Sequence, residues 1–259
     1  MLDDLGADVA LDHPPERVVS LVPSLTEAIA LTVPGVLVGA TNWCTHPAGL
    51  DVTRVRGTKN PDRAAIAALR PDLVVANQEE NRRVDVERLR SVGIPVWVTR
   101  IDGIDDALGS MGRLFRKGFG LREVGWLEEA REVWRHPPRL SGRVALPVWR
   151  DPWIWVGAGT YPDDLLRHLG LVNIVDDMRY PHLKINDALS RSPDVVLLPD
   201  EPYPFTATDG PEALGGVGSL NVRGRSLFWY GPAMVGARAD LEDAVHEGRG
   251  AFRKAPANW

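Results

Sequence analysis

The chain has 259 residues, 44% hydrophobic and 25% charged, which is typical of a globular protein with a sizeable core. Its net charge of −5 and its scattered basic residues do not suit a nucleic-acid-binding surface, so we expect no nucleic-acid partner. A single cysteine excludes an intrachain disulfide and a four-cysteine zinc site, and no apolar stretch reaches the ~18 residues that span a membrane.

The first half of the sequence alternates between short apolar runs and segments with helical spacing. Ser24 and Glu27 have the spacing of a capping box, which predicts a helix directly after the first strand. Asn60 and Pro61 are typical of a helix cap and a first helical turn. The alternation predicts a parallel sheet with crossover helices. The predicted strands are 17–22, 36–39, 71–76 and 93–99. Three helices are predicted: one that begins at Ser24, one that covers 62–70, and one that ends near residue 92.

Residues 104–135 carry apolar side chains at helical spacing without a strand signal. They predict two helices, the second of which is long and ends before Pro137. The alternating pattern then restarts, and residues 250–259 are expected to form a loose tail. The strands predicted for this half are 143–149, 194–198 and 226–229, and the helices are 162–169, 186–191 and 233–247.

One sequence pattern occurs in both halves. Residues 68–75 and 189–196 each read as a helix end, a Pro-Asp pair and a buried strand. Each strand runs into an acidic loop, which contains Glu79 and Glu80 in the first half and Asp200 and Glu201 in the second. The repetition indicates that the two halves are variants of one α/β plan.

The candidate ligand-binding residues follow the predicted strands, because ligands bind beyond the carboxyl ends of open parallel sheets. Aromatic side chains gather there and are suited to large flat or apolar ligands. Trp149 and Trp155 are interpreted as core residues at strand ends. The predicted ligand contacts are Trp43, Trp153, Tyr203, Phe205, Trp229 and Tyr230 as aromatic contacts, Lys59, Asn60, Glu79, Glu80, Arg82 and Glu201 for polar edges, and His46 as a possible ligand of the bound metal.

Two other interpretations of the stretch around Cys44 and His46 stay open. A metal held by protein side chains needs further ligands, for which Glu79, Glu80, His182 and Glu201 are available only if the fold brings them close. A nucleophilic Cys44 needs a base and an oxyanion hole, and His46 lies two residues away. An enzyme on this scaffold, or a partner-binding module with a degenerate cleft, are therefore the alternatives to a binding protein.

A resemblance to a known family is carried by four segments, 14–27, 71–76, 89–96 and 192–196. Together they resemble the metal-chelate solute-binding proteins of ABC importers, the cobalamin- and siderophore-binding group also called helical-backbone metal receptors. The resemblance implies an α/β fold of two Rossmann-like lobes with mainly parallel sheets, joined by a long backbone helix. The corresponding boundaries are 1–117, 118–137 and 138–259.

The resemblance also implies a function. A chelate such as a cobalamin-like corrinoid, haem or an iron-siderophore would lie in the cleft between the lobes, with no catalytic residues and no required cofactor. We expect a monomer that delivers its ligand to an ABC permease. In the family a glutamate on each lobe docks on the importer, whereas this chain has Arg82 or Arg83 near the first such position. The resemblance implies a periplasmic or extracellular location, and the absence of a visible signal peptide implies a cytoplasmic one.

Overall fold

The computed structural model describes residues 1–248, so the loose tail predicted for 250–259 lies outside the described residues. Contacts divide the chain into two compact units. The predicted boundaries of two lobes and a linking helix stay a prediction. Unit 1 comprises Met1–Ile101, Asp105–Arg131 and Tyr230–Pro232, and unit 2 comprises Asp102–Ile104, Glu132–Trp229 and the residues from Ala233 onward.

Unit 1 is built on a five-stranded sheet with the order β3-β2-β1-β6-β7, in which every pairing is parallel. Three of its strands, β1, β6 and β7, are buried along their whole length. Burial on both faces explains why these strands are continuous apolar runs rather than alternating patterns. The predicted parallel sheet is confirmed. Its strands are β1 (Val18–Ser20), β2 (Leu37–Ala40), β3 (Thr53–Arg54), β6 (Leu73–Asn77) and β7 (Val96–Thr99).

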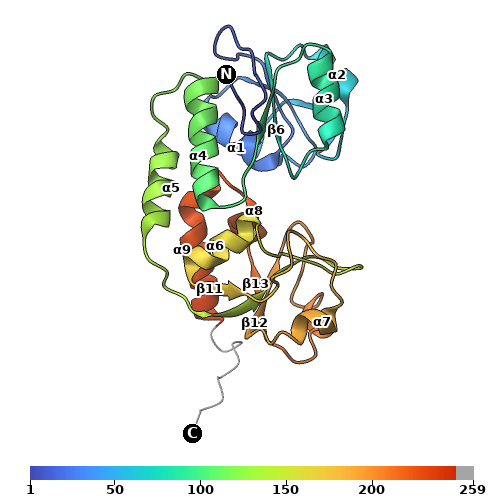
Figure 1. The fold of residues 1–259 in the computed structure, drawn as a ribbon, viewed down its shortest axis with the longest axis vertical. Coiled ribbons are helices and arrows are strands. Elements are labelled where there is room, and N and C mark those ends of the chain that lie inside the picture. Colours follow the sequence, from blue (N-terminus) through green and yellow to red (C-terminus); the bar gives the residue numbers. More distant parts are fainter. Residues whose placement is uncertain (249–259) are drawn as a thin grey trace. The chain divides into compact units, whose positions relative to one another are not determined.

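Helices cover both faces of this sheet (Figure 1). Helices α2 and α3 pack on one face, where Ile66 and Leu89 join Val19, Val74 and Val98 in one core cluster. Helices α1 and α4 lie on the other side of β6. The bounds are α1 (Pro23–Thr32), α2 (Arg63–Ala68), α3 (Arg83–Ser91) and α4 (Ile104–Arg113).

Two predicted helix starts in unit 1 are wrong. Helix α1 begins at Pro23 after Val22 and has no side-chain cap, because a proline at the first position already has the backbone angle that a helix needs. Ser24 therefore lies inside the helix. Helix α2 is capped by Asp62, whose side chain accepts a hydrogen bond from the Ala65 amide. A small antiparallel pair takes up the segment before it, formed by β4 (Arg56–Gly57) and β5 (Asn60–Pro61).

The segment expected to link the two halves contains two helices, as predicted. A π-helical turn (Leu114–Gly118) extends α4, and α5 (Gly125–Arg135) follows. The second helix is shorter than the predicted 118–137. Gly120 has a φ of +71°, a left-handed conformation that interrupts the helix between the two elements.

Unit 2 contains a four-stranded sheet with the order β11-β8-β12-β13, again with parallel pairings throughout. Helices α6 and α9 contact the strands β11 and β13. On the other side, Ala188 of α7 packs with Trp155, Val196 and Leu198 in one core cluster. The strands are β8 (Gly142–Ala145), β11 (Leu171–Asn173), β12 (Val195–Pro199) and β13 (Ser219–Val222), with a separate antiparallel pair of β9 (Pro147–Trp149) and β10 (Ile154–Trp155).

The strand predicted at 226–229 is wrong. These residues fall in and after the short helix α8 (Gly224–Phe228), and the strand of this region is β13, which precedes it. A four-residue apolar run fits a buried helix turn as well as a strand, so periodicity does not separate the two. The remaining helices are α6 (Tyr161–Leu169), α7 (Ile185–Leu189) and α9 (Ala233–Glu247), with a 3-10 turn at Pro211–Ala213.

The repeated Pro-Asp pattern has the same local structure in both units. Asp72 accepts hydrogen bonds from the amides of Glu16 and Arg17 at 2.9 Å each, just before β1. Asp194 accepts one from the amide of Arg143 at 2.7 Å, within β8. In each unit the carboxylate therefore fixes the start of one central strand against the next.

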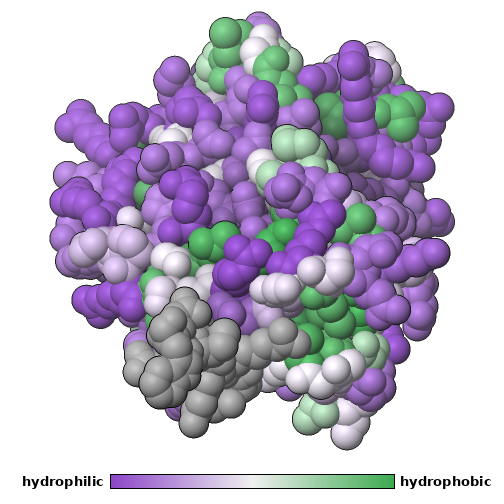
Figure 2. All heavy atoms as spheres, turned by 60° about the horizontal axis from the view of Figure 1, so that its bottom comes forward, coloured by the Kyte–Doolittle hydropathy of each residue, from purple (hydrophilic) through white to green (hydrophobic). Residues whose placement is uncertain are grey.

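The surface is mostly hydrophilic. On the face shown in Figure 2, hydrophobic side chains form separate patches between hydrophilic ones. Within residues 1–248, no helix combines the length and the apolar character that crossing a bilayer requires. Among the large hydrophobic residues that are exposed, two tryptophans matter for the site below, Trp43 and Trp149.

Candidate functional site

Unit 1 has a topological switch point beside its central strand β1. The chain passes from β1 through α1 to β2 on one side, and β6 later adds to the other side. The carboxyl ends of β1 and β6 thus open a crevice, which is where open α/β sheets bind ligands. The loops at this crevice are Leu21–Ser24 and Asn77–Asn81.

Two asparagines fix the loop after β6. Asn77 accepts hydrogen bonds from the amides of Glu79 and Glu80, at 2.8 and 3.3 Å. The buried Asn81 accepts one from the Asn77 amide at 2.8 Å and donates to the carbonyl oxygens of Leu21 and Thr58, at 3.3 and 3.0 Å. Asn81 therefore ties three segments of the crevice together, and the acidic pair is held rather than freely solvated.

Glu80 and Tyr230 meet at this loop. The Tyr230 hydroxyl donates a hydrogen bond to Glu80 Oε1 at 3.2 Å, although the two residues are 150 positions apart in the chain. Burial raises the pKa of Glu80 to about 7, against the lowering effects of the Tyr230 hydrogen bond and the Lys59 charge. Burial also raises the pKa of Tyr230 well above its ordinary value. Glu80 therefore changes its charge near neutral pH.

The thiol of Cys44 is buried in the same unit. Thr26 donates a hydrogen bond to its sulfur at 3.0 Å, and the Thr41 hydroxyl lies 3.1 Å from it. Burial raises the pKa of the thiol, so its nucleophilic form is disfavoured. Among residues 1–248, no group of three or more histidine, cysteine, aspartate or glutamate side chains is placed to hold a metal ion. Both observations count against the alternative interpretations of this stretch.

The other predicted contacts of unit 1 are near the surface. Trp43 is 67% exposed and lies beside Gly57, where an added Cβ would come within 3.3 Å of the indole nitrogen. His46 is half-buried, with Nδ1 3.1 Å from the Thr45 hydroxyl. Lys59 is exposed and donates to the Glu79 carbonyl oxygen, and Asn60 is exposed as well.

Arg82 has a structural partner. Its guanidinium pairs at 2.8 Å with the buried carboxylate of Asp85, which also pairs with Arg63. Because this carboxylate is buried between two arginines, a ligand would have to compete with an existing ion pair for Arg82. As a ligand contact, Arg82 stays a prediction.

Unit 2 repeats the switch point. Its chain passes from β8 to β11 on one side, and β12 later adds to the other side of β8. The segments after these central strands contain β9 and residues 200–205. In or beside these segments lie the predicted contacts Trp153, Glu201, Tyr203 and Phe205. In both units, therefore, the predicted contacts follow the carboxyl ends of the central strands, where open α/β sheets bind ligands.

The aromatic side chains of unit 2 form a continuous series. Trp149 packs edge-on against Tyr203, with ring centres 5.5 Å apart, and Tyr203 contacts Phe205 at 4.6 Å. Trp153 stacks on Phe205 at 5.9 Å and on Trp155 at 5.6 Å. Trp155 and Phe205 are buried, whereas Trp149 is 43% exposed. The interpretation of Trp149 as a core residue is thus wrong, and its ring is the solvent-exposed end of the series.

Arg150 supports this series from the side. Its guanidinium lies 5.3 Å from the centre of the Trp153 ring and pairs with the carboxylates of Asp209 and Glu212. These carboxylates raise the pKa of Arg150, so it remains a cation. Tyr203 donates a hydrogen bond to Asp209 at 2.8 Å. The loop around Asp209 therefore holds two of the aromatic residues in place.

Glu201 and Trp229 form a separate contact of unit 2. Trp229 is only 7% exposed, and it makes a hydrogen bond with the Glu201 side chain. The Arg225 guanidinium lies 5.3 Å from its ring centre. Burial, with the neighbouring Asp200, raises the pKa of Glu201. Most of the Trp229 ring is covered, so it offers less surface to a ligand than Trp149 does.

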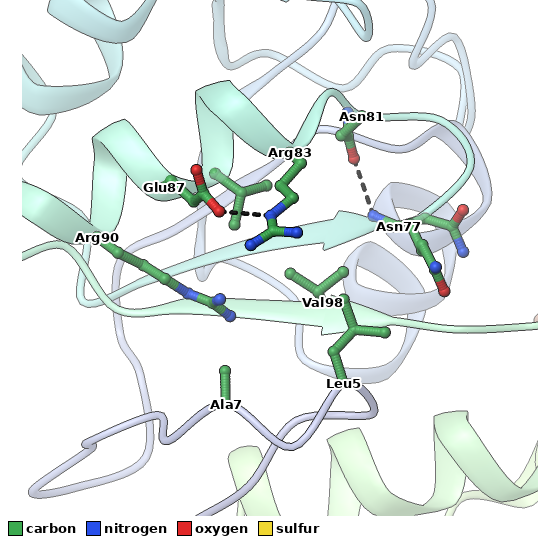
Figure 3. Close-up of a pocket in the computed structure, with 10 residues that line it drawn as sticks. Leu5, Ala7, Asn77, Asn81, Arg83, Glu87, Arg90 and Val98 are labelled. Carbon is green, nitrogen blue, oxygen red and sulfur yellow. Dashed lines mark hydrogen bonds and ion pairs between the residues drawn. The ribbon is translucent and has the colours of Figure 1, made fainter.

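A cavity of ≈ 530 Å³ lies between α3 and the N-terminal segment of unit 1 (Figure 3). Arg83, Glu87 and Arg90 lie above it, and Leu5 lies opposite, with Val98 between them. Arg83 pairs with Glu87, and Arg90 pairs with the buried Asp3. The charges of its wall are therefore balanced within the protein. Of the predicted ligand contacts, none lines this cavity.

Comparisons with known proteins give relatives of one kind. No protein-family model matches the chain. A vitamin B12-binding protein of Vibrio cholerae is 25% identical over 201 residues, which cover 73% of this chain and 72% of that protein. A cobalamin-binding protein of Halobacterium salinarum is 30% identical over 212 residues, 75% of this chain and 57% of that protein.

Solved structures agree with these relatives. A periplasmic vitamin B12-binding protein of Vibrio cholerae has a TM-score of 0.71 at 20% identity, covering 92% of this chain and 99% of that one. A periplasmic haem-binding protein of Pseudomonas aeruginosa has a TM-score of 0.73 at 18% identity, with coverages of 93% and 95%. The chain is similar in sequence to vitamin B12-binding proteins. It has the fold of the helical-backbone metal receptors, and the predicted resemblance is confirmed.

Sequence reasoning missed several residues that hold the loops and aromatic side chains described above. Trp149 was assigned to the core, and Asn77, Asn81 and Arg150 were not singled out. The signal for the asparagines was their position directly after a buried strand, where amide side chains cap loops through backbone hydrogen bonds. No local signal marks Arg150, because its partners lie about sixty positions further along the chain.

Proposed function

We propose that this protein is a solute-binding protein for a metal chelate, and that loop residues at the carboxyl edge of its parallel sheets contact the ligand. The candidate ligands are a cobalamin-like corrinoid, haem and a ferric siderophore. The chain would release its ligand to an ABC-type importer from a periplasmic or extracellular location. The homology to vitamin B12-binding proteins over about three quarters of the chain carries this proposal.

The surface of the molecule supports the same ligand class. Trp43 follows β2 in unit 1 and is 67% exposed, and Trp149 ends β9 in unit 2 and is 43% exposed, so both rings offer some surface to a flat ligand. Large indole rings bury apolar surface at a small cost in side-chain entropy, and such exposed rings at strand ends are typical of ligand contacts. The buried, poorly ionised Cys44 argues against a cysteine-based enzyme at this edge.

A tryptophan-fluorescence titration tests the proposal. Purified protein is titrated with cyanocobalamin, haemin and ferrichrome, with free zinc as a metal control and with correction for ligand absorbance. We expect saturable quenching by at least one chelate. Trp43→Ala and Trp149→Ala should each weaken the affinity for that chelate by about 30-fold. This corresponds to the loss of ~2 kcal/mol from buried aromatic surface.

Trp126→Phe is the matched control. Trp126 donates a hydrogen bond to Thr32 at the end of α1, and packs edge-on against Phe115. Because α1 begins at the carboxyl edge of the sheet, its last residue lies away from that edge. The control should therefore lose fluorescence but keep its affinity. Absence of quenching by all three chelates contradicts the proposed function.

A further inference from the structure

Glu80 has an unusual position for a loop carboxylate. Its backbone is held by Asn77, and its Oε1 accepts the Tyr230 hydroxyl. In the part of the chain that the structure describes, Tyr230 is the one side chain that hydrogen-bonds to this carboxylate. The second oxygen, Oε2, accepts no hydrogen bond from these described residues, and the Glu80 residue is half-buried rather than fully covered.

The charges around Glu80 are few and come from four segments. The Lys59 ammonium attracts the carboxylate, and the adjacent Glu79 repels it. Burial raises the pKa of the Cys44 thiol, and the negative charge of Glu80 adds to this effect. From α1, the Ser24 hydroxyl lies close to the Tyr230 hydroxyl. Among these groups the single cation, Lys59, thus faces the two carboxylates Glu79 and Glu80, and the Cys44 and Ser24 side chains are neutral. The negative charge of Glu80 is therefore incompletely compensated.

We propose that Glu80 is a proton-linked ligand contact: as a carboxylate it accepts, through Oε2, a hydrogen bond from an N–H or O–H group of the ligand. This inference rests on the proposed function. It narrows the ligand class to chelates with donor groups, such as carboxamides, at their edge. A donor stabilises the charged form of a buried carboxylate, so binding releases a proton whenever Glu80 is protonated beforehand.

The linkage has a defined sign. Burial places the pKa of Glu80 at about 7 in the free protein, so the carboxylate is the major form above that value and the minor form below it. The carboxylate is the stronger acceptor for the ligand donor at Oε2, because protonation occupies an acceptor position and removes the charge. Affinity is therefore full at about pH 8 and should fall about 10-fold by about pH 6, because one proton must leave for each ligand bound.

Isothermal titration calorimetry between about pH 5.5 and pH 8.5 tests the inference, with cyanocobalamin, ferrichrome and haemin as separate probes. Repeating the titration at neutral pH in buffers of different ionisation enthalpy counts the protons released. We expect wild-type protein to show the 10-fold fall with cyanocobalamin or ferrichrome, both of which carry amide N–H groups. Glu80→Gln should bind with an affinity independent of pH and release no proton.

Tyr230→Phe separates a proton-linked contact from a structural role. It removes the hydroxyl that stabilises the Glu80 carboxylate, so the pH profile of affinity should move to higher pH. A merely structural Glu80 would leave that profile unmoved. Circular dichroism of each variant confirms that it is folded before titration.

Each outcome decides between the two proposals. Binding of cyanocobalamin or ferrichrome with a pH-independent affinity overturns the inference and leaves the proposed function intact. The same holds if the pH dependence persists in Glu80→Gln, or if haemin alone binds, because haem propionates do not donate N–H bonds. Absence of binding by all probes at every pH overturns the proposed function, and this inference with it.

Discussion

Replacing Asn81 by alanine should destabilise unit 1 by an amount that the structure allows us to estimate. The substitution removes the hydrogen bond that Asn81 accepts from the Asn77 amide and the two that it donates to the carbonyl oxygens of Leu21 and Thr58. A net contribution of about 1 kcal/mol per bond gives a loss of about 3 kcal/mol. For a protein of this size, that corresponds to a fall in Tm of about 6 to 12 °C.

The assay has to report on unit 1 itself, since a chain with two units need not unfold in one step. Thermal unfolding followed by circular dichroism gives the change in Tm. Hydrogen exchange of the Glu79 and Glu80 amides gives the local effect, because both amides donate to Asn77 within the loop that Asn81 closes. We expect their protection to fall in the variant even at temperatures where the protein stays folded.

Gln78→Ala is the matched control. Gln78 is an exposed amide side chain in the same loop, so its removal should change the free energy of unfolding by less than about 0.5 kcal/mol. Equal effects of Asn81→Ala and Gln78→Ala would refute the reasoning that Asn81 joins the strand ends. In that case the loop would be held by the Asn77 side chain alone.

Three further predictions concern charge and packing. Because the fold raises the pKa of Glu80 from 4.5 to about 7, folding favours its protonated form. The stability from this group is present below pH 4.5 and is lost as pH rises toward about 7. In urea-unfolding titrations, the free energy of unfolding of Glu80→Gln should therefore fall by about 2 to 3 kcal/mol less than that of wild type over this pH range. Cys44 should react with iodoacetamide at about pH 8 at least ~10-fold more slowly in folded protein than in urea, and equal rates would show that the thiol is exposed. Arg150→Met should weaken chelate binding, because Trp153 loses the guanidinium beside its ring, whereas the contribution of Trp43 to binding should not change. An unchanged affinity would show that Trp153 needs no support from Arg150 and its partners Asp209 and Glu212.

The fold could be predicted from sequence because its signals are local. Strands such as β6 are unbroken apolar runs followed by polar loops, and each helix between them has a clear period. The Pro-Asp repeat was visible for the same reason, since Asp72 and Asp194 act on the strand directly beside them in the sheet. The errors fall on helix starts, as at α1, and on short elements. Helix α8 has five residues, which is too few for a helical period to differ from a strand.

The site could be predicted only as a region. The rule that ligands bind at the carboxyl edge selects a set of loops, and which side chains are exposed within those loops depends on partners far away in sequence. Trp149 is exposed because Tyr203 covers only one edge of its ring, and Trp229 is buried beside Glu201 and Arg225. The link between Glu80 and Tyr230 has no signature in either segment, since it exists only when the chain returns to unit 1.

That return has a consequence for protein synthesis. Tyr230–Pro232 belong to unit 1, although the residues on both sides of them belong to unit 2. When the whole β-sheet of unit 1 has been translated, the Tyr230 hydroxyl that pairs with Glu80 has therefore not yet been synthesised. Unit 1 is completed only when Tyr230 has been translated, after most of unit 2, and a nonsense mutation before Tyr230 leaves the Glu80 carboxylate without that hydroxyl. A chain that stops before Tyr230 thus loses the hydrogen-bond partner of a carboxylate that lies 150 positions earlier in the sequence.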